Sequence, residues 1–223
     1  MKSSKLPSCP YQYVVIEGNI GAGKTSLATK ISQDYRAKLI LERFAENPFL
    51  EKFYQNPDRY ALSLEMAFLT DRYHQLKDEL QSGDMFHPFF VSDYYFTKSL
   101  IFARNTLSGD EFHLYAQLFH IIHSSLPKPD LYVYLHLDTK QLLWNIQNRG
   151  RAYEKVITAD YLDSIRSSYF EYLKQQSEMR IALVDTRNLD FIAHEEHYHL
   201  LLETIFNRDL SPGITRLFPN TDG

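Results

Sequence analysis

Residues 11–25 read YQYVVIEGNIGAGKT, a β-branched run followed by a glycine-rich turn. The run is typical of a buried strand that ends at Gly18, and a helical pattern begins at Lys24. Residues 18–25 fit G-x-x-x-x-G-K-[ST] in the strand–turn–helix context that this pattern requires. The segment therefore predicts a loop that binds the phosphates of a nucleotide.

The residue types of this loop have a direct chemical reason. Glycines allow successive backbone N–H groups to converge on phosphate oxygens, and the helix N-terminus adds a favourable dipole. Lys24 is suited to neutralise the β/γ oxygens of ATP, and the Thr25 hydroxyl can hold Mg²⁺. The loop alone does not separate kinases from GTPases or other ATPases. The residues expected to contact the nucleotide are Gly18, Asn19, Ile20, Gly21, Ala22, Gly23, Lys24, Thr25 and Ser26.

The remaining chain alternates short apolar runs with helical patterns. Strands are predicted at 11–17, 38–41, 89–92, 131–137 and 180–185, and helices at 24–34, 50–55, 58–81, 96–107, 111–124, 139–148, 160–176 and 192–206. This alternation predicts an α/β fold with a five-stranded parallel sheet and helices on both faces. No repeat or linker divides the chain, so we expect one domain over residues 1–223 with loose tails at 1–10 and 210–223.

The composition excludes several classes of protein. The 223 residues carry a net charge of −4, which argues against a nucleic-acid partner. No apolar run approaches the length of a membrane span, and the first ten residues lack the apolar core of a signal peptide. Cys9 is the one cysteine, so no disulfide can form within the chain. We expect a cytoplasmic protein without a membrane partner.

Two acidic residues end predicted strands. Glu42 follows the second strand and Asp93 the third, so both are expected at the carboxyl edge of the sheet, near the phosphates. Asp93 can hold Mg²⁺, and Glu42 can accept a proton from a hydroxyl group. The strings N-K-x-D and D-x-x-G, typical of GTPases, do not occur. The alternative for each residue is a surface acid at a strand end.

Arg149 and Arg151 begin a polar loop between two predicted helices. We interpret this loop as a lid over the nucleotide. Two guanidinium groups on a lid can bind the oxygens of a transferring phosphoryl group, and a closed lid excludes water. A basic helix C-terminus that complements its dipole is the alternative interpretation.

Taken together, these residues resemble the deoxynucleoside kinase family of P-loop enzymes, and its bacterial deoxyadenosine/deoxyguanosine kinase-like branch in particular. The resemblance extends from Val14 to Phe191. It rests on EGNIGAGKT at 17–25, ENPFLEKFYQNPDRYALSLEMAFLTDRY at 46–73, the strand ending at Asp93, and RGRAYEK at 149–155. It implies phosphorylation of the 5′-hydroxyl of a deoxynucleoside by ATP with Mg²⁺, in nucleotide salvage.

The resemblance also implies roles for matching positions. Glu42 corresponds to the general base, and Lys24, Arg149 and Arg151 complete the catalytic set. Tyr54 and Glu154 correspond to the pair that holds the sugar 3′-hydroxyl. The base is expected to meet Glu65, Phe68 and Arg72, with Asp93 beside the nucleoside, and residues 186–190 to lie near the donor adenine. Relatives pair through helices such as 96–107 and 111–124, so a homodimer is expected.

Four positions depart from the family pattern. Tyr94 and Tyr95 stand where the family usually has arginine and serine, and Asn145 replaces one lid arginine. Lys98, one helical turn further on, could replace the first of these. Glu65 stands where a glutamine is usual. An ionised carboxylate only accepts hydrogen bonds, which matches N1–H and the 2-amino group of guanine. It serves adenine only by accepting from N6 or by being protonated. The change predicts a purine preference with guanine favoured.

Two other functions fit parts of the sequence. A nucleoside monophosphate kinase of the thymidylate-kinase type shares the strand-end acid and the lid, and Arg43 could supply the extra cation that a monophosphate needs. A degenerate nucleotide-binding module is suggested by Tyr94 in place of an arginine. The presence of Lys24, Thr25, Glu42 and Asp93 argues against the second alternative.

Overall fold

The computed structural model describes residues 6–44, 47–81 and 85–219. Six parallel strands form one sheet in the order β2-β3-β1-β4-β5-β6. The α/β fold predicted from the sequence is therefore confirmed, with one strand more than expected. The strands are β1 Tyr13–Gly18, β2 Lys38–Ile40, β3 Phe90–Ser92, β4 Leu131–His136, β5 Arg180–Asp185 and β6 Gly213–Leu217.

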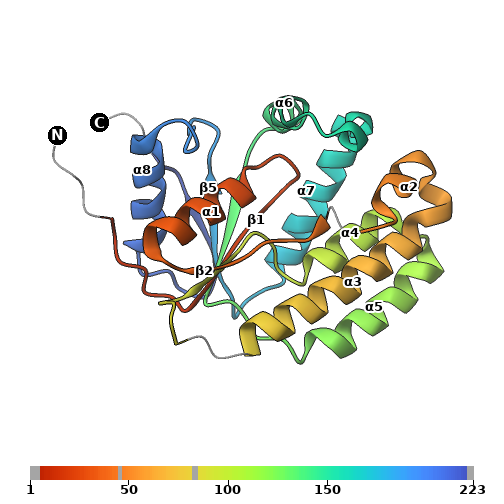
Figure 1. Ribbon diagram of the computed structural model, residues 1–223, viewed down its shortest axis with the longest axis horizontal. Helices are drawn as coiled ribbons and strands as arrows, with labels where there is room; N and C mark the ends of the chain where they lie inside the picture. Colours follow the sequence, from red (N-terminus) through yellow and green to blue (C-terminus); the bar gives the residue numbers. More distant parts are fainter. Residues whose placement is uncertain (1–5, 45–46, 82–84, 220–223) are drawn as a thin grey trace.

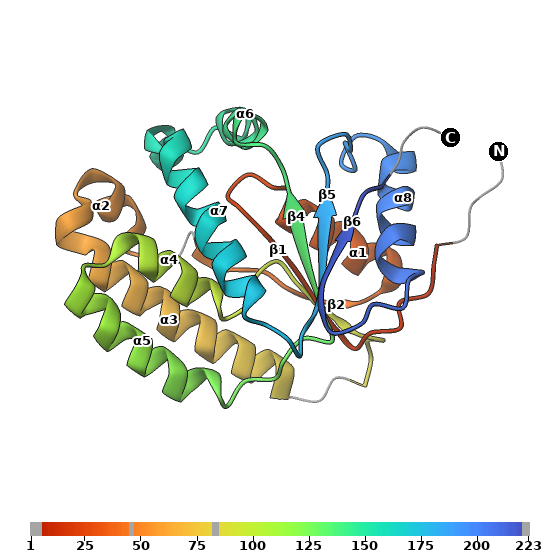
Figure 2. The ribbon, with the colours of Figure 1, turned by 180° about the vertical axis from the view of Figure 1, so that it is seen from behind.

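Helices cover both faces of the sheet (Figures 1 and 2). One face carries α1 and α8, and the other carries the layer that contains α3, α4, α5 and α7. The bounds are α1 Lys24–Tyr35, α2 Leu50–Gln55, α3 Pro57–Gln81, α4 Lys98–Thr106, α5 Gly109–His123, α6 Thr139–Arg149, the 3₁₀ helix η2 Ala152–Val156, α7 Ala159–Lys174 and α8 Glu195–Phe206. In the described parts of the chain, no helix has the length and apolar character needed to cross a membrane.

Strand β1 lies at the centre of the core because its side chains alternate between the two faces. Val14 and Ile16 pack in the cluster that includes α1 and α8, whereas Tyr13 and Val15 pack in the cluster that includes α7. Val14, Val15 and Ile16 have no exposed surface. A strand buried on both faces reads as a continuous apolar run, which is the pattern seen in residues 13–16.

The prediction of a loose tail from residue 210 is wrong over 213–217. These residues form β6, which pairs in parallel with β5 and buries Leu217 in the core. Gly213 has φ +96° where the strand begins, and its N–H donates to the Met179 carbonyl at 2.9 Å. An edge strand that follows Pro212 and carries exposed Arg216 lacks the apolar pattern of the central strands.

The expected N-terminal tail is also held in its described part. Residues 6–10 form neither helix nor strand, but Leu6 and Cys9 pack against the core and the Tyr35 hydroxyl donates to the Pro7 carbonyl at 2.7 Å. Residues 1–5, 45–46, 82–84 and 220–223 lie outside the described part of the chain.

Candidate active site

The glycine-rich loop joins β1 to α1, and two of its glycines cannot be replaced without strain. Gly21 has φ +83° and Gly23 has φ +85°. A Cβ atom at Gly21 would lie 2.8 Å from the Leu142 carbonyl oxygen, and one at Gly23 would lie 2.9 Å from the Phe191 ring. Both the left-handed backbone and the close packing therefore require glycine at these two positions.

Side chains within the loop hold its shape. Asn19 is 3% exposed, and its amide nitrogen donates to the Leu162 carbonyl at 2.7 Å while its oxygen accepts from the Ile20 N–H at 2.8 Å. The Lys24 ammonium donates to the Asn19 carbonyl at 2.9 Å. Burial, and to a smaller degree the charge of Lys98, lowers the pKa of Lys24 to about 8. An anionic phosphate is therefore a favourable partner for this ammonium.

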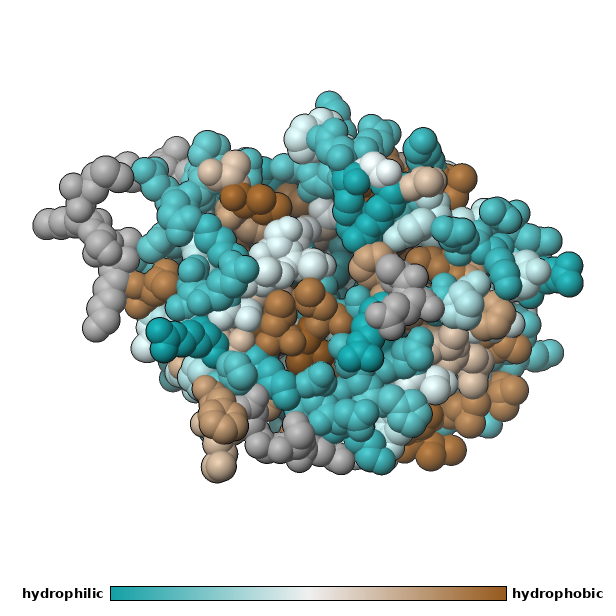
Figure 3. Space-filling model, viewed as in Figure 1, coloured by the Kyte–Doolittle hydropathy of each residue, from teal (hydrophilic) through white to brown (hydrophobic). Residues whose placement is uncertain are grey.

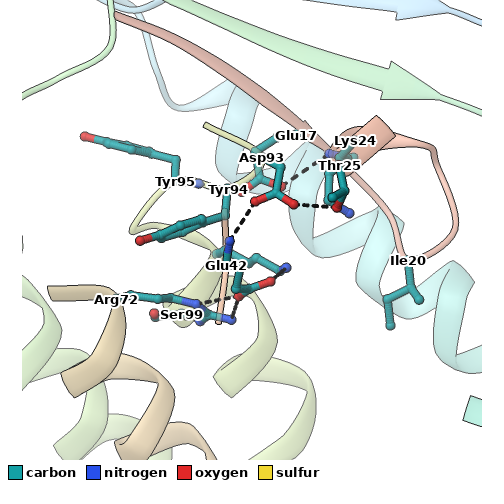
Figure 4. Close-up of polar contacts among 12 residues, drawn as sticks. Glu17, Ile20, Lys24, Thr25, Glu42, Arg72, Asp93, Tyr94, Tyr95 and Ser99 are labelled. Atoms are coloured by element: carbon teal, nitrogen blue, oxygen red, sulfur yellow. Dashed lines mark hydrogen bonds and ion pairs between the residues drawn. The ribbon is translucent and has the colours of Figure 1, made fainter. Parts of the chain in front are cut away.

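Asp93 connects the loop to Glu42, which follows β2 (Figure 4). One carboxylate oxygen accepts from the Thr25 hydroxyl at 2.5 Å, and the other accepts from the backbone N–H of Glu42 at 2.8 Å. A carboxylate and a hydroxyl fit Mg²⁺, which binds few protein oxygens and takes waters and phosphates as its other ligands. Within the described residues, no three His, Cys, Asp or Glu side chains form a metal-binding group. The Asp93 carboxylate and the Thr25 hydroxyl therefore suit a Mg²⁺ ion that enters the site bound to a nucleotide.

Glu42 is held by two cations. Its Oε1 accepts from Nε and Nη2 of Arg72 at 2.8 and 2.5 Å, and its Oε2 accepts from the Lys98 ammonium at 2.5 Å. The side chain of Glu42 is 10% exposed. Burial acts to raise its pKa, but Lys98 and Arg72 outweigh burial and hold the pKa at about 2. Glu42 is therefore an ionised hydrogen-bond acceptor across the physiological range.

Glu65 lies deeper and has a different environment. It is 2% exposed, and its Oε1 accepts from the Thr106 hydroxyl at 2.8 Å. Its Oε2 has no hydrogen-bond partner among the described residues. Burial raises the pKa of Glu65 to about 7, although Arg72 opposes the shift. A buried acceptor without a donor is costly, so this oxygen is a favourable point of contact for a ligand.

Arg72 lies between these two carboxylates but is bound to one of them. Its Nε and Nη2 bind Glu42, as described above. Its Nη1 donates to the Ser99 hydroxyl at 2.8 Å. The guanidinium lies 4.6 Å from the centroid of the Phe68 ring. Two of its nitrogens therefore bind Glu42 and the third binds Ser99.

The two lid arginines converge on Glu154. Arg149 donates to both oxygens of this carboxylate, at 3.1 and 2.6 Å, and Arg151 donates at 3.3 Å. Arg151 also lies 4.0 Å from the centroid of the Phe44 ring. Tyr54 stacks on Tyr153 with ring centroids 5.9 Å apart.

One cavity of about 800 Å³, counting its open mouth, collects most of the predicted site residues. Six predicted residues do not line it: Gly18, Asn19, Ala22, Gly23, Ser26 and Tyr54. Phe53, Leu64 and Phe102 add apolar walls that the sequence did not single out. The predicted residues that line it are Ile20, Gly21, Lys24, Thr25, Glu42, Glu65, Phe68, Arg72, Asp93, Arg149, Arg151 and Glu154.

Glu17 is a site neighbour that sequence reasoning missed. This residue is the single acid of β1 and has no exposed surface, and it accepts from the Tyr95 N–H and the Tyr169 hydroxyl, both at 2.9 Å. Burial raises its pKa, while Lys98 and Lys24 act to lower it. The available signal was a charged residue within an otherwise apolar strand, directly before the glycine-rich loop.

The departures at Tyr94, Tyr95 and Asn145 have clear structural roles. Tyr94 and Tyr95 are fully buried; the Tyr94 hydroxyl donates to Gln75 at 2.9 Å, and that of Tyr95 lies 3.2 Å from Nε2 of His123. Asn145 donates from α6 to the Gly21 carbonyl at 2.8 Å. The tyrosines therefore fill the core beside the site, and Asn145 joins the lid helix to the glycine-rich loop.

Comparisons with known proteins agree with this architecture. The family model described as deoxynucleoside kinase matches residues 14–210. The chain is 37% identical over 194 residues to a protein named deoxyguanosine kinase from Bacillus subtilis (strain 168), covering 83% of this chain and 92% of that one. It is 30% identical over 205 residues to another deoxyguanosine kinase from Lactobacillus johnsonii, covering 86% and 90%.

A solved structure shows the same fold. The deoxyadenosine kinase from M. mycoides with bound dCTP superposes with a TM-score of 0.74 at 23% sequence identity. The match covers 87% of this chain and 99% of that one.

Proposed function

The chain belongs to the deoxynucleoside kinase family, and on that premise we propose that Glu42, Lys24, Arg149 and Arg151 form its catalytic centre and that guanine is its preferred base. The protein is a phosphotransferase that moves a phosphoryl group from ATP to the 5′-hydroxyl of a deoxynucleoside. The family match does not favour a monophosphate kinase or a degenerate module. We further propose that residues 1–223 act as one domain.

The reaction assigns a step to each group. The 5′-hydroxyl oxygen forms a bond to the γ-phosphorus, the bond from that phosphorus to the β–γ bridging oxygen breaks, and ADP leaves. The hydroxyl proton passes to Glu42, which lines the same cavity as Lys24 and Thr25. This shared cavity is the observation that carries the proposal.

The positive groups around the donor have complementary roles. Lys24 would neutralise the β/γ oxygens, and Thr25 with Asp93 would hold Mg²⁺, which supplies charge neutralisation at the transferring group. Arg149 and Arg151 would bind the equatorial oxygens. Because Glu154 holds both arginines in this structure, their transfer to phosphate is a closing step of the lid.

The nucleoside would occupy the opposite end of the cavity. We assign the 3′-hydroxyl to Glu154, which lines the cavity, and to Tyr54, which stacks on the lining residue Tyr153. We assign the base to the space beside Phe68, Glu65 and Arg72. Residues 186–190 would lie near the donor adenine. Phe191, which directly follows them, packs on Gly23 of the phosphate loop.

The guanine preference is supported by the unpaired Oε2 of Glu65. Guanine presents two donors on one edge, N1–H and the 2-amino group, to two carboxylate oxygens. Adenine presents one donor, N6–H, and one acceptor, N1, so an ionised Glu65 accepts only from N6 and a second hydrogen bond requires a protonated Glu65. Both relatives named above are called deoxyguanosine kinases.

The decisive experiment measures phosphorylation of the four deoxynucleosides with ATP and Mg²⁺ for wild type and Glu65→Gln. We expect purines to lead in wild type, deoxyguanosine first, and the variant to shift towards deoxyadenosine. Glu51→Gln, on an exposed position, is the matched control. A preference for deoxycytidine or thymidine would contradict the proposal.

We also propose a cytoplasmic homodimer that acts in nucleotide salvage. Leu114 and Ile121 on α5 are 57% and 72% exposed, and Figure 3 shows apolar surface at the lower right, where α5 lies in Figure 1. Light scattering should give twice the 26.2 kDa chain mass. Ile121→Asp should shift the protein towards monomer, and a monomeric wild type would contradict the dimer.

A further inference from the structure

Lys98 is a buried cation that the catalytic set proposed above does not use. It begins α4, and its side chain is 9% exposed. Lysine is seldom buried without a compensating partner, because removing an ammonium from water is costly. The position of Lys98 therefore needs a specific interaction to support it.

That interaction is with Glu42. The Lys98 ammonium donates to Oε2 at 2.5 Å and lies 5.3 Å from the centroid of the Phe102 ring. Its charge also acts on Glu17 and Lys24, so it influences the residues next to the phosphate loop as well as Glu42. No other lysine on the described elements donates to Glu42.

The hydrogen bonds of Glu42 are unequally distributed between its oxygens. Oε1 accepts two N–H groups of Arg72, which uses both of its lone pairs. Among the described residues Oε2 accepts from Lys98 alone, so one lone pair of this oxygen is left for a further donor. A hydroxyl group entering the cavity would therefore donate to Oε2.

The chain after β3 explains why a lysine at 98 takes this role. Residues 91–99 are all buried, and Tyr94 and Tyr95 direct their hydroxyls to Gln75 and His123 rather than to Glu42. The Lys98 N–H donates to the Tyr95 carbonyl at 3.0 Å, which starts the helix. Lys98 is the first cation that this segment offers to the cavity.

We propose that Lys98 is a positioning residue for phosphoryl transfer: it fixes Glu42 so that Oε2 faces the 5′-hydroxyl and accepts its proton. The inference rests on the proposed role of Glu42 as general base. Two cations weaken Glu42 as a base, but phosphoryl transfer depends chiefly on positioning and charge, so orientation outweighs basicity. Arg72 holds the other oxygen and thereby fixes the plane of the carboxylate.

The test compares Lys98→Met, Lys98→Arg and the exposed control Lys174→Met. Lys98→Met should lower kcat about 10- to 100-fold, less than the full effect of a general base, with the KM for ATP within about twofold. Lys98→Arg should restore most of the rate. An unchanged kcat in Lys98→Met would overturn the proposal. Lys98→Gln provides the same comparison if the methionine variant does not fold.

A second measurement separates positioning from a purely structural effect. In the Glu42→Gln background, Lys98→Met should lower kcat by less than about twofold further, because Lys98 acts through Glu42. A further loss as large as in the wild-type background would contradict the proposal. Full activity of Glu42→Gln would instead remove the general base itself, so the two failures are distinguishable.

Discussion

The Asp93 carboxylate accepts the backbone N–H of Glu42 at 2.8 Å. This bond joins the ends of two neighbouring parallel strands, and the other oxygen of Asp93 binds Thr25 of the phosphate loop. The proposed magnesium site and the proposed general base are thus fixed to one another through a single side chain. A change at Asp93 should therefore affect both the metal and the position of Glu42.

We expect Asp93→Asn to reduce the rate on the order of 10²-fold at low Mg²⁺, about 3 kcal/mol of transition-state stabilisation. The amide keeps the size of the side chain but loses the charge that attracts the ion. Initial rates over a Mg²⁺ series should show partial recovery at high concentration. Asp71→Asn, on the exposed side of α3, is the control, and an unchanged Mg²⁺ dependence would remove Asp93 from the metal site.

Glu42→Gln should lower kcat by about 10²- to 10⁴-fold while most of the ATP affinity remains. The glutamine keeps the shape of the side chain but cannot take the hydroxyl proton. Lys24→Ala should lose both turnover and ATP affinity, because Lys24 is proposed to contact the phosphates directly. Steady-state kinetics and calorimetric ATP binding separate the two effects. A near-normal rate of Glu42→Gln would argue against its role as base.

Binding of Mg·ATP should take up a proton at alkaline pH. The pKa of Lys24 is lowered to about 8 by burial, and a bound phosphate favours its charged form. Affinity should hold below pH 8 and fall above it, since the free enzyme then loses the proton that binding must restore. Calorimetry in buffers of different ionisation enthalpy should detect uptake near zero at pH 7 and about one proton at pH 9. Equal proton uptake at pH 7 and pH 9 would contradict the assignment of this proton to Lys24.

Much of the site could be predicted because the topology of a parallel sheet fixes where strand ends lie. Glu42 and Asp93 were expected at one edge from their positions after two strands, and the sheet register brings them into hydrogen-bond contact. The glycine-rich loop followed from its spacing between strand and helix. These features depend on backbone geometry, which the sequence pattern reports well.

Side-chain partners were harder to predict because several cations reach the same carboxylate. Sequence reasoning expected Arg72 at the base edge, but its guanidinium binds Glu42 and Ser99. Glu17 gave no signal beyond its charge, since its partners Tyr95 and Tyr169 come from distant segments. The edge strand β6 was missed because only Leu217 of its residues is fully buried.

The pH dependence of base preference should run in opposite directions for the two purines. Burial raises the pKa of Glu65 to about 7, so its protonation changes between pH 6 and 8. Guanine needs the ionised carboxylate, so kcat/KM for deoxyguanosine should rise through this window. Adenine forms both hydrogen bonds only with the protonated carboxyl, so kcat/KM for deoxyadenosine should fall over the same window. The ratio of the two should change several-fold, and Glu65→Gln should abolish both slopes because an amide does not titrate there. Parallel profiles for the two purines in wild type would show that Glu65 does not contact the base.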